Sequence, residues 1–287
     1  MLAAFACALA WGCESQPEGR TPALPASMQP ARSTNANATP PAIPFDSATP
    51  RVRAKAVATW PHDTGAYTQG LLVDGARLLE GTGLEGHSEL REVQRQTGRV
   101  ERRTPLPASL FGEGIAVVGD RLYQLTWLGG RGYIYRASTL APLDSFSYAG
   151  EGWGLTSDGT RLYLSDGSSR IRVLDPNGMV VERTFEVKEA GRPVWMLNEL
   201  EWISGELWAN IYQTGWIARI DPRSGVVLAW IDTSTLLTPG ERADVATRGG
   251  TANGIAYDPA TRRVLITGKR WPKLFELELA SIGGRSR

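Results

Sequence analysis

One short sequence frame recurs five times along this chain and constrains the fold more than any other feature. Each copy has a large or polar residue, usually followed by glycine and then by an apolar residue. The copies are centred on Gln69, Glu113, Trp153, Asn198 and Asn253, which are 44, 40, 45 and 55 residues apart. A repeat of roughly 40–50 residues with four short strands is typical of a β-propeller blade. The sequence therefore predicts an all-β, five-bladed β-propeller.

The segments between the copies have the pattern of four-stranded antiparallel blades. Alternating strand-like runs are separated by polar turns such as residues 175–178, Asp-Pro-Asn-Gly. The longest spacing contains an inserted loop at residues 236–250, in which we expect a short helix. The last unit ends near Leu279 after three strands. We expect an N-terminal strand at residues 52–59 to complete this blade, because such a closure removes the open edges of the ring.

Composition divides the chain into four parts. Residues 1–13 are small and apolar, too short to span a bilayer as a helix, and are typical of a signal peptide. Residues 14–50 are rich in Pro, Ala, Ser and Thr and indicate a disordered linker. We expect the propeller at residues 51–280 and a polar tail at 281–287. These features predict export to the periplasm as a membrane-anchored lipoprotein, through lipidation of Cys13, or as a secreted protein after ordinary signal cleavage.

Charge and the scarcity of metal-binding residues narrow the classes of function. The formal net charge is +1 with 21% charged residues, so no basic stripe indicates a nucleic-acid partner. Cys7 and Cys13 are the only cysteines, and His62 and His87 are the only histidines. A thiol nucleophile, a disulfide framework and a His/Cys zinc site are therefore not expected in the propeller. We interpret both histidines as structural.

Equivalent positions of successive blades meet around the axis of a propeller, so the five central residues of the frame should form a ring at one mouth. Such a ring of one carboxylate, three amides and an indole would bind a small ligand. Glu113 is either a reactive group or a solvated channel carboxylate. The glycines beside it, Gly112 and Gly114, either leave the carboxyl open or fit crowded inner strands.

Three further residues follow the second strands of their blades and should project toward the same mouth. These are Trp127, Tyr212 and Lys269. The alternative for the two aromatic side chains is packing between blades. The alternative for Lys269 is a solvated loop charge.

A set of short motifs, in order between Trp60 and Leu279, resembles the plant and bacterial type of glutaminyl-peptide cyclotransferase. The motifs are residues 61–71 (PHDTGAYTQGL), 111–114 (FGEG), 124–127 (QLTW), 150–155 (GEGWGL), 198–201 (NELE), 208–210 (WAN), 253–258 (NGIAYD) and 267–269 (TGK). The resemblance implies a five-bladed propeller that uses no zinc or other cofactor. It also implies conversion of the N-terminal glutamine of a peptide to pyroglutamate with release of ammonia. We expect the protein to act as a monomer.

The resemblance places the active site on a set of matching positions: Tyr67, Gln69, Glu113, Trp127, Trp153, Asn198 and Lys269. Tyr212 stands where the family often has tryptophan, so its expected role is stacking. Glu113 would be the general acid–base, because one carboxylate can take the amine proton and pass it to the leaving nitrogen. Lys269, Gln69 and Asn198 could donate to the developing oxyanion, and the aromatic residues would wall the substrate.

Two other functions fit the same ring. The first is a lactonase-like hydrolase with a divalent metal held by Glu113, Asn198 and Asn253, and a further carboxylate from Asp166 or Glu199. The second is a non-catalytic envelope propeller that binds a protein through its loops.

Overall fold

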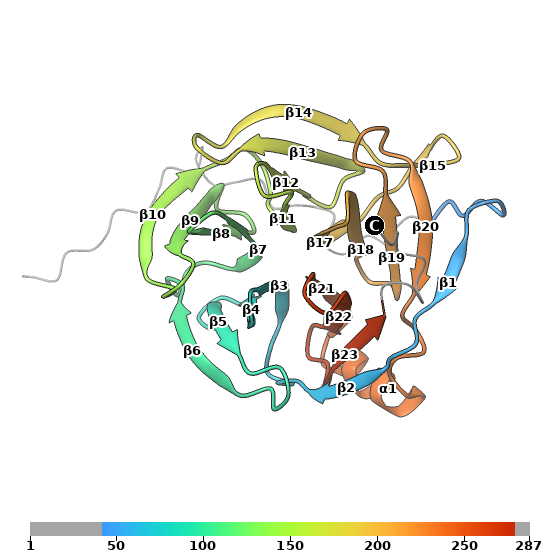
Figure 1. Ribbon diagram of the computed structural model, residues 1–287, viewed down its shortest axis with the longest axis horizontal. Coiled ribbons are helices and arrows are strands. Elements are labelled where there is room, and N and C mark those ends of the chain that lie inside the picture. The colour runs from blue at the N-terminus through green and yellow to red at the C-terminus, as the bar shows by residue number, and fades with distance from the viewer. Residues whose placement is uncertain (1–41, 279–287) are drawn as a thin grey trace, which may run out of the picture. The chain divides into compact units, whose positions relative to one another are not determined.

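The computed structural model describes residues 42–278, and within them all but one of the elements are strands. The expected leader at residues 1–13, most of the expected linker and the expected tail lie outside the described residues. Five blades of four antiparallel strands form a β-propeller, as the repeat predicts, and one of these sheets carries a fifth strand at its outer edge (Figure 1). None of the described helices is long and apolar enough to span a membrane.

The blades follow one another in chain order, each running from the centre of the ring outward (Figure 1). Blade one comprises β3 (Thr68–Asp74), β4 (Arg77–Thr82), β5 (Glu89–Val93) and β6 (Val100–Pro105). Blade two comprises β7 (Gly112–Val118), β8 (Arg121–Thr126), β9 (Arg131–Arg136) and β10 (Pro142–Ser147). Blade three comprises β11 (Leu155–Ser157), β12 (Leu162–Leu164), β13 (Arg170–Asp175) and β14 (Val180–Glu186). Blade four comprises β17 (Leu197–Ile203), β18 (Glu206–Ile211), β19 (Trp216–Ile220) and β20 (Val227–Asp232).

Blade five is closed by a strand from the other end of the chain. It comprises β21 (Ala252–Asp258), β22 (Arg263–Gly268), β23 (Lys273–Glu278) and, on the outside, β2 (Ala58–Pro61). The closure is as expected, but its residues differ from the expected 52–59. The segment divides, because β1 (Arg51–Arg53) pairs in parallel with β20 of blade four before the chain crosses to β23. Ala54, at the crossing, is buried between these two blades.

Residues 42–50, at the end of the expected linker, lie against blade four. The Phe45 ring packs at 4.9 Å from Trp216 and 5.2 Å from Trp230, measured between centroids. A small hairpin, β15 (Lys188–Glu189) and β16 (Arg192–Pro193), lies beside this segment, where Glu189 accepts a hydrogen bond from the Asp46 amide. The composition alone gave no sign of this packing.

Five of the six apolar clusters in the described residues lie between two neighbouring blades, and the sixth lies between the inserted loop and blade five. Because successive side chains of a strand point to opposite faces, one inner strand contributes apolar side chains to the clusters on both of its sides. Leu71 of β3 packs toward blade five, whereas Leu72 packs toward blade two. This alternation holds the ring together without a central core and leaves the channel positions free for polar side chains.

The inserted loop contains α1 (Pro239–Thr247), as expected from its length. Thr238 caps the helix by accepting from the Glu241 amide, and the Glu241 carboxylate accepts from the Thr238 amide in return. This reciprocal pair is the capping box that a Thr-x-x-Glu sequence predicts.

Candidate active site

The inner strands are irregular at the positions of the recurring frame. The register between first and second strands shifts at 68/70, 112/115, 197/200 and 252/255, and β11 begins just after Trp153. A β-bulge leaves residues out of the ladder and redirects their side chains. The recurring frame in the sequence therefore marks a repeated bulge at one end of the inner strands.

The glycines of the frame allow neighbouring inner strands to touch. A Cβ on Gly114 would lie 2.4 Å from the Leu155 amide nitrogen, and one on Gly154 would lie 2.1 Å from the Asn198 carbonyl oxygen. The Gly114 amide donates to the Trp153 carbonyl oxygen at 2.8 Å across the blade boundary. Of the two interpretations of the glycines beside Glu113, the structure supports close approach of crowded strands.

Glu113 is buried, with 4% of its surface exposed, and is therefore not the solvated channel carboxylate of the alternative interpretation. Its Oε1 accepts a hydrogen bond from Gln69 Nε2 at 3.1 Å. Burial raises the pKa of Glu113 well above its usual value; the charge of Lys269 opposes this rise, and that of Glu151 adds to it. A carboxyl in such a position holds its proton to a higher pH than an exposed carboxyl does.

Lys269 is also buried, with 1% of its surface exposed, which differs from a solvated loop charge. Its Nζ donates to Gln69 Oε1 and lies 4.8 Å from the ring centroid of Tyr67 and 5.7 Å from that of Tyr212. Burial lowers the pKa of Lys269 to about 8, while the carboxylates of Glu113 and Glu199 oppose the shift. Gln69 thus links the buried acid and the buried amine through the two ends of one amide.

Aromatic side chains surround this acid–amine pair. Glu151 Oε2 accepts from the indole nitrogens of both Trp127, at 2.8 Å, and Trp153, at 2.9 Å. The Trp153 ring packs edge-on against Tyr212 at 5.5 Å between centroids. The two tryptophans are therefore held by one carboxylate from the same motif as Trp153.

Phe111 and Tyr67 extend this aromatic wall. The Phe111 ring lies 5.7 Å from Trp127 and 6.0 Å from Tyr67, edge-on to both. Burial raises the pKa of Tyr67, and contact with Tyr212 adds to the rise. Phe111 and Glu151 were not among the residues expected in the site, although both lie in motifs that carry the resemblance. Their proximity to the site residues depends on loop geometry.

The two ring asparagines differ in their surroundings. Asn253 Nδ2 donates to the Thr68 carbonyl oxygen at 2.9 Å and to Gln69 Oε1 at 3.3 Å, so Asn253 belongs to the same network. Asn198 is buried, and its backbone oxygen accepts from Ser165 Oγ at 2.6 Å. The Oδ1 atoms of Asn198 and Asn253 are buried without a hydrogen-bond partner.

Two further buried carboxylates, Glu199 and Glu201, lie in the same inner strand as Asn198. Glu199 accepts from the amides of Leu71, at 3.2 Å, and Ile255, at 2.9 Å, and so joins blade four to blades one and five. Glu201 accepts from the Tyr257 amide at 2.8 Å. Burial raises the pKa of Glu199 well above its usual value, and burial also raises that of Glu201 to about 8.

The contacts of the carboxylates do not favour the metal-dependent alternative. Both oxygens of Glu199 face backbone N–H groups, and Asp166 accepts from Ser168 and lies 3.6 Å from an Arg172 guanidinium nitrogen. In the part of the chain that the structure describes, no group of three His, Asp or Glu side chains has the geometry of a metal site.

The two histidines have the structural settings expected of them. His62 is buried and contacts the Trp271 carbonyl oxygen through Nδ1 and Glu80 Oε1 through Nε2, at 2.8 Å and 3.1 Å. Burial favours a higher pKa for Glu80, but the Arg91 guanidinium and His62 lower the pKa of this carboxyl to about 2. His87 is exposed and donates its backbone amide to Leu84 in a turn.

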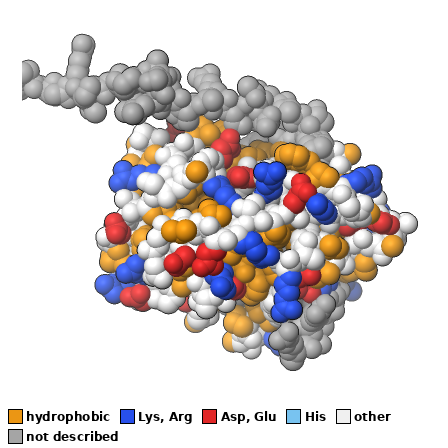
Figure 2. All heavy atoms as spheres, turned by 90° about the horizontal axis from the view of Figure 1, so that it is seen from above, with side chains coloured by type: hydrophobic (Ala, Val, Ile, Leu, Met, Phe, Trp, Pro, Cys, Tyr) orange, Lys and Arg blue, Asp and Glu red, His pale blue; other side chains and the backbone are white. Residues whose placement is uncertain are grey.

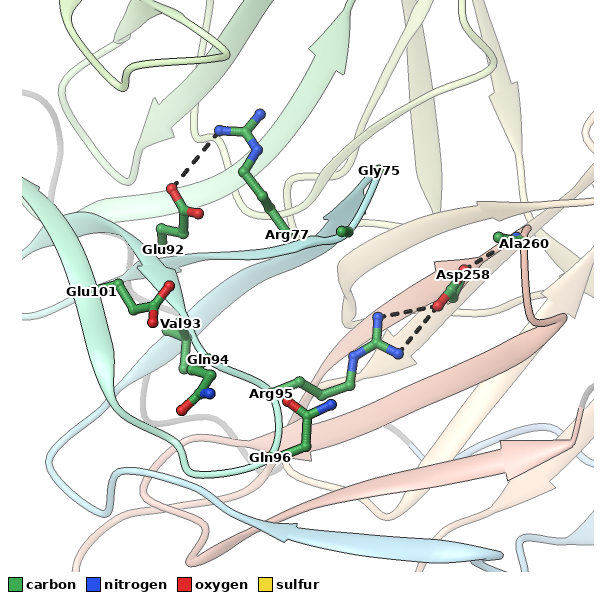
Figure 3. Close-up of a pocket in the computed structure, with 11 residues that line it drawn as sticks. Gly75, Arg77, Glu92, Val93, Gln94, Arg95, Gln96, Glu101, Asp258 and Ala260 are labelled. Atoms are coloured by element: carbon green, nitrogen blue, oxygen red, sulfur yellow. Dashed lines mark hydrogen bonds and ion pairs between the residues drawn. The ribbon is translucent and has the colours of Figure 1, made fainter.

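A cavity of about 470 Å³ lies at the opposite ends of the strands, between blades one and five (Figure 3). It is lined by turns that follow β3, β5 and β21, whereas Gln69 lies at the start of β3. Arg95 is fixed there by Asp258, with both nitrogens at 3.1 Å. The cavity is separate from the cluster around Glu113.

On the face of the molecule drawn in Figure 2, basic and acidic side chains are interspersed.

Comparison with known proteins agrees with the motifs and the fold. Residues 25–279 match the family model described as glutamine cyclotransferase. A glutaminyl-peptide cyclotransferase of Arabidopsis thaliana is 42% identical over 237 residues, which are 80% of this chain and 72% of the plant protein. The crystal structure of Myxococcus xanthus glutaminyl cyclase superposes with a TM-score of 0.75 at 34% identity, covering 80% of this chain and 97% of that one. The buried acid–amine pair described above thus lies in a five-bladed propeller that belongs to the glutamine cyclotransferase family.

Proposed function

We propose that the protein is a glutaminyl-peptide cyclotransferase that converts the N-terminal glutamine of peptides to pyroglutamate, with Glu113 as the general acid–base. The observation that carries this proposal is the buried pair of Glu113 and Lys269, joined through Gln69 and enclosed by aromatic rings. The family assignment and the two similar cyclases support the same reaction.

The reaction needs one proton to move between two nitrogens. The neutral α-amine attacks the γ-carboxamide carbon, a C–N bond forms, and Glu113 takes a proton from the attacking nitrogen. Glu113 then returns that proton to the amide nitrogen, the second C–N bond breaks, and ammonia leaves. The raised pKa makes Glu113 a stronger base for the first proton transfer than an exposed carboxylate would be.

The protein also supplies orientation and charge stabilisation. The attack is intramolecular, so holding the glutamine side chain folded over its own amine provides much of the acceleration. The Lys269 ammonium is placed to stabilise the oxyanion of the tetrahedral intermediate in a dry site. The tryptophans joined by Glu151 wall the folded side chain.

The contacts suggest separate tasks for the two amides Gln69 and Asn198. Gln69 uses its nitrogen on Glu113 and its oxygen on Lys269 and Asn253, so it orients the acid and the amine. Asn198 keeps an unpartnered buried Oδ1, which can accept from the substrate's α-amine.

The test uses a Gln-initiated peptide and its N-acetylated form. The wild-type protein should release ammonia from the free peptide and none from the acetylated one, whose amine cannot attack. Glu113→Gln should lower the rate of cyclisation by roughly 10²–10⁴-fold while the thermal midpoint stays close to that of the wild type. Glu101→Gln, an exposed carboxylate on β6, serves as the control. Near-normal turnover by Glu113→Gln would remove Glu113 from the role of acid–base.

We also propose that the chain is exported and acts as a monomer on extracytoplasmic peptides. The apolar leader, Cys13 and the Pro- and Ala-rich segment support export. Fractionation of cells making the wild type and Cys13→Ser tests it: membrane association that the substitution abolishes indicates a lipid anchor, and purely cytoplasmic protein contradicts export.

A further inference from the structure

Among residues 42–278, Arg270 differs from the other buried or partly buried arginines because it forms no ion pair with a carboxylate. Among residues 42–278, the buried or partly buried arginines that form an ion pair with Asp or Glu are Arg77, Arg91, Arg95, Arg172, Arg219, Arg248 and Arg263. Arg270 is partly buried and has no such pair in this range. Partly burying a guanidinium without a counter-charge is unfavourable, so a missing partner indicates a binding role.

The guanidinium of Arg270 lies at the candidate active site. Its Cζ is 5.9 Å from the ring centroid of Tyr67, the same ring that lies 4.8 Å from Lys269 Nζ. The backbone fixes this position, because Arg270 has a φ of 58° and donates its amide to the Ala66 carbonyl oxygen at 2.7 Å. Two successive residues thus place two cations against one phenol ring.

The two cations differ in their exposure. Lys269 is buried and is already used by Gln69, whereas Arg270 is partly exposed to solvent. A peptide whose first residue lies against Lys269 must extend from the buried cluster toward its solvent-exposed side, where Arg270 lies. The residue that follows the glutamine is then the one closest to Arg270.

We propose that Arg270 is a specificity residue that binds the carboxylate of an acidic side chain immediately after the N-terminal glutamine. The planar guanidinium matches a carboxylate with two parallel hydrogen bonds, which a single ammonium does not. This inference rests on the proposed function, since it assigns the second residue of that substrate.

The test compares three peptides that differ only in their second residue: Gln-Glu, Gln-Ala and Gln-Lys, each followed by the same sequence. In the wild type, kcat/KM should decrease in that order, and the peptides should differ in KM rather than in kcat. Arg270→Gln should reduce the ratio between Gln-Glu and Gln-Lys peptides by roughly fivefold, the upper range for a partly exposed ion pair. Added salt should reduce the wild-type ratio in the same direction.

A matched control lies at the other end of β22. Arg262 is exposed and has a similar backbone, with a φ of 56°, but lies in the turn away from the site. Arg262→Gln removes the same charge and should leave the ratio unchanged. Arg270→Glu should reverse the order and favour Gln-Lys, an effect that loss of packing alone would not produce.

The outcomes separate the two proposals. If the wild type cyclises all three peptides and its ratio is the same in Arg270→Gln, the specificity role is wrong and the cyclotransferase function stands. An equal change of the ratio in Arg262→Gln would show a general charge effect and also overturn the role of Arg270. If no Gln-initiated peptide releases ammonia, the proposed function fails and the inference fails with it.

Discussion

Substitution of Gly154 by alanine tests whether the close approach of inner strands sets the geometry of the site. The added Cβ would lie 2.1 Å from the Asn198 carbonyl oxygen and 2.9 Å from Glu199 Cα, both backbone atoms that cannot rotate away. Restoring an ordinary contact requires blades three and four to separate by roughly 1 Å at this point. The same movement would displace Trp153 relative to Asn198.

The expected cost has a structural and a catalytic part. Overpacking of this kind lowers the free energy of unfolding by about 1–3 kcal/mol, which corresponds to a decrease of roughly 2–12 °C in Tm for a domain of this size. A displacement of about 1 Å at a catalytic site reduces kcat/KM by up to ~10²-fold. Thermal unfolding and ammonia release by the same preparation measure both.

The control is Gly240→Ala in the first turn of α1, where an added Cβ meets nothing within 4 Å. Alanine has the better helix propensity, so this variant should be as stable as the wild type or about 0.5–1 kcal/mol more stable. If Gly154→Ala has the Tm and activity of the wild type, the glycine is not needed for strand approach and the reasoning is refuted.

Three more predictions concern the buried charges. Because the pKa of Lys269 is lowered to about 8, kcat/KM should fall as the pH rises through this value and the ammonium loses its proton. The Lys269→Arg variant stays charged and should not show this decrease at alkaline pH. If its pH profile is the same as that of the wild type, the proposed role of Lys269 is wrong. Glu151→Leu should lower kcat/KM by roughly tenfold or more, because both indole N–H groups lose their acceptor. Glu151→Gln keeps an acceptor, so its decrease in kcat/KM should be smaller. Equal activity of the two variants would argue against orientation of the tryptophans by Glu151. Glu199→Gln replaces one of two acceptor oxygens by an N–H donor and should lower the free energy of unfolding by about 1–3 kcal/mol; a denaturant titration that gives the wild-type value would contradict the role of Glu199 in joining the blades.

The sequence by itself determined the number and order of the blades. The spacing of the frame and the turn residues between strands are local properties, because blades one to four are each continuous in sequence and blade five takes only its outer strand from elsewhere. The helix in the inserted loop was predictable for the same reason, since its capping residues are adjacent in sequence. The positions of Glu113 and Lys269 near one mouth followed from the repeat and from the family resemblance together.

Only the tertiary structure decided how the side chains of the site are shared between blades. The link from Glu113 through Gln69 to Lys269 joins blades one, two and five, and no local pattern specifies a contact between such distant segments. The bridging role of Glu151 and the isolation of Arg270 depend on which groups the loops bring within hydrogen-bonding distance. The frame showed where polar residues interrupt the inner strands, and the closure of the ring, by burying them together, determined their partners and their pKa values.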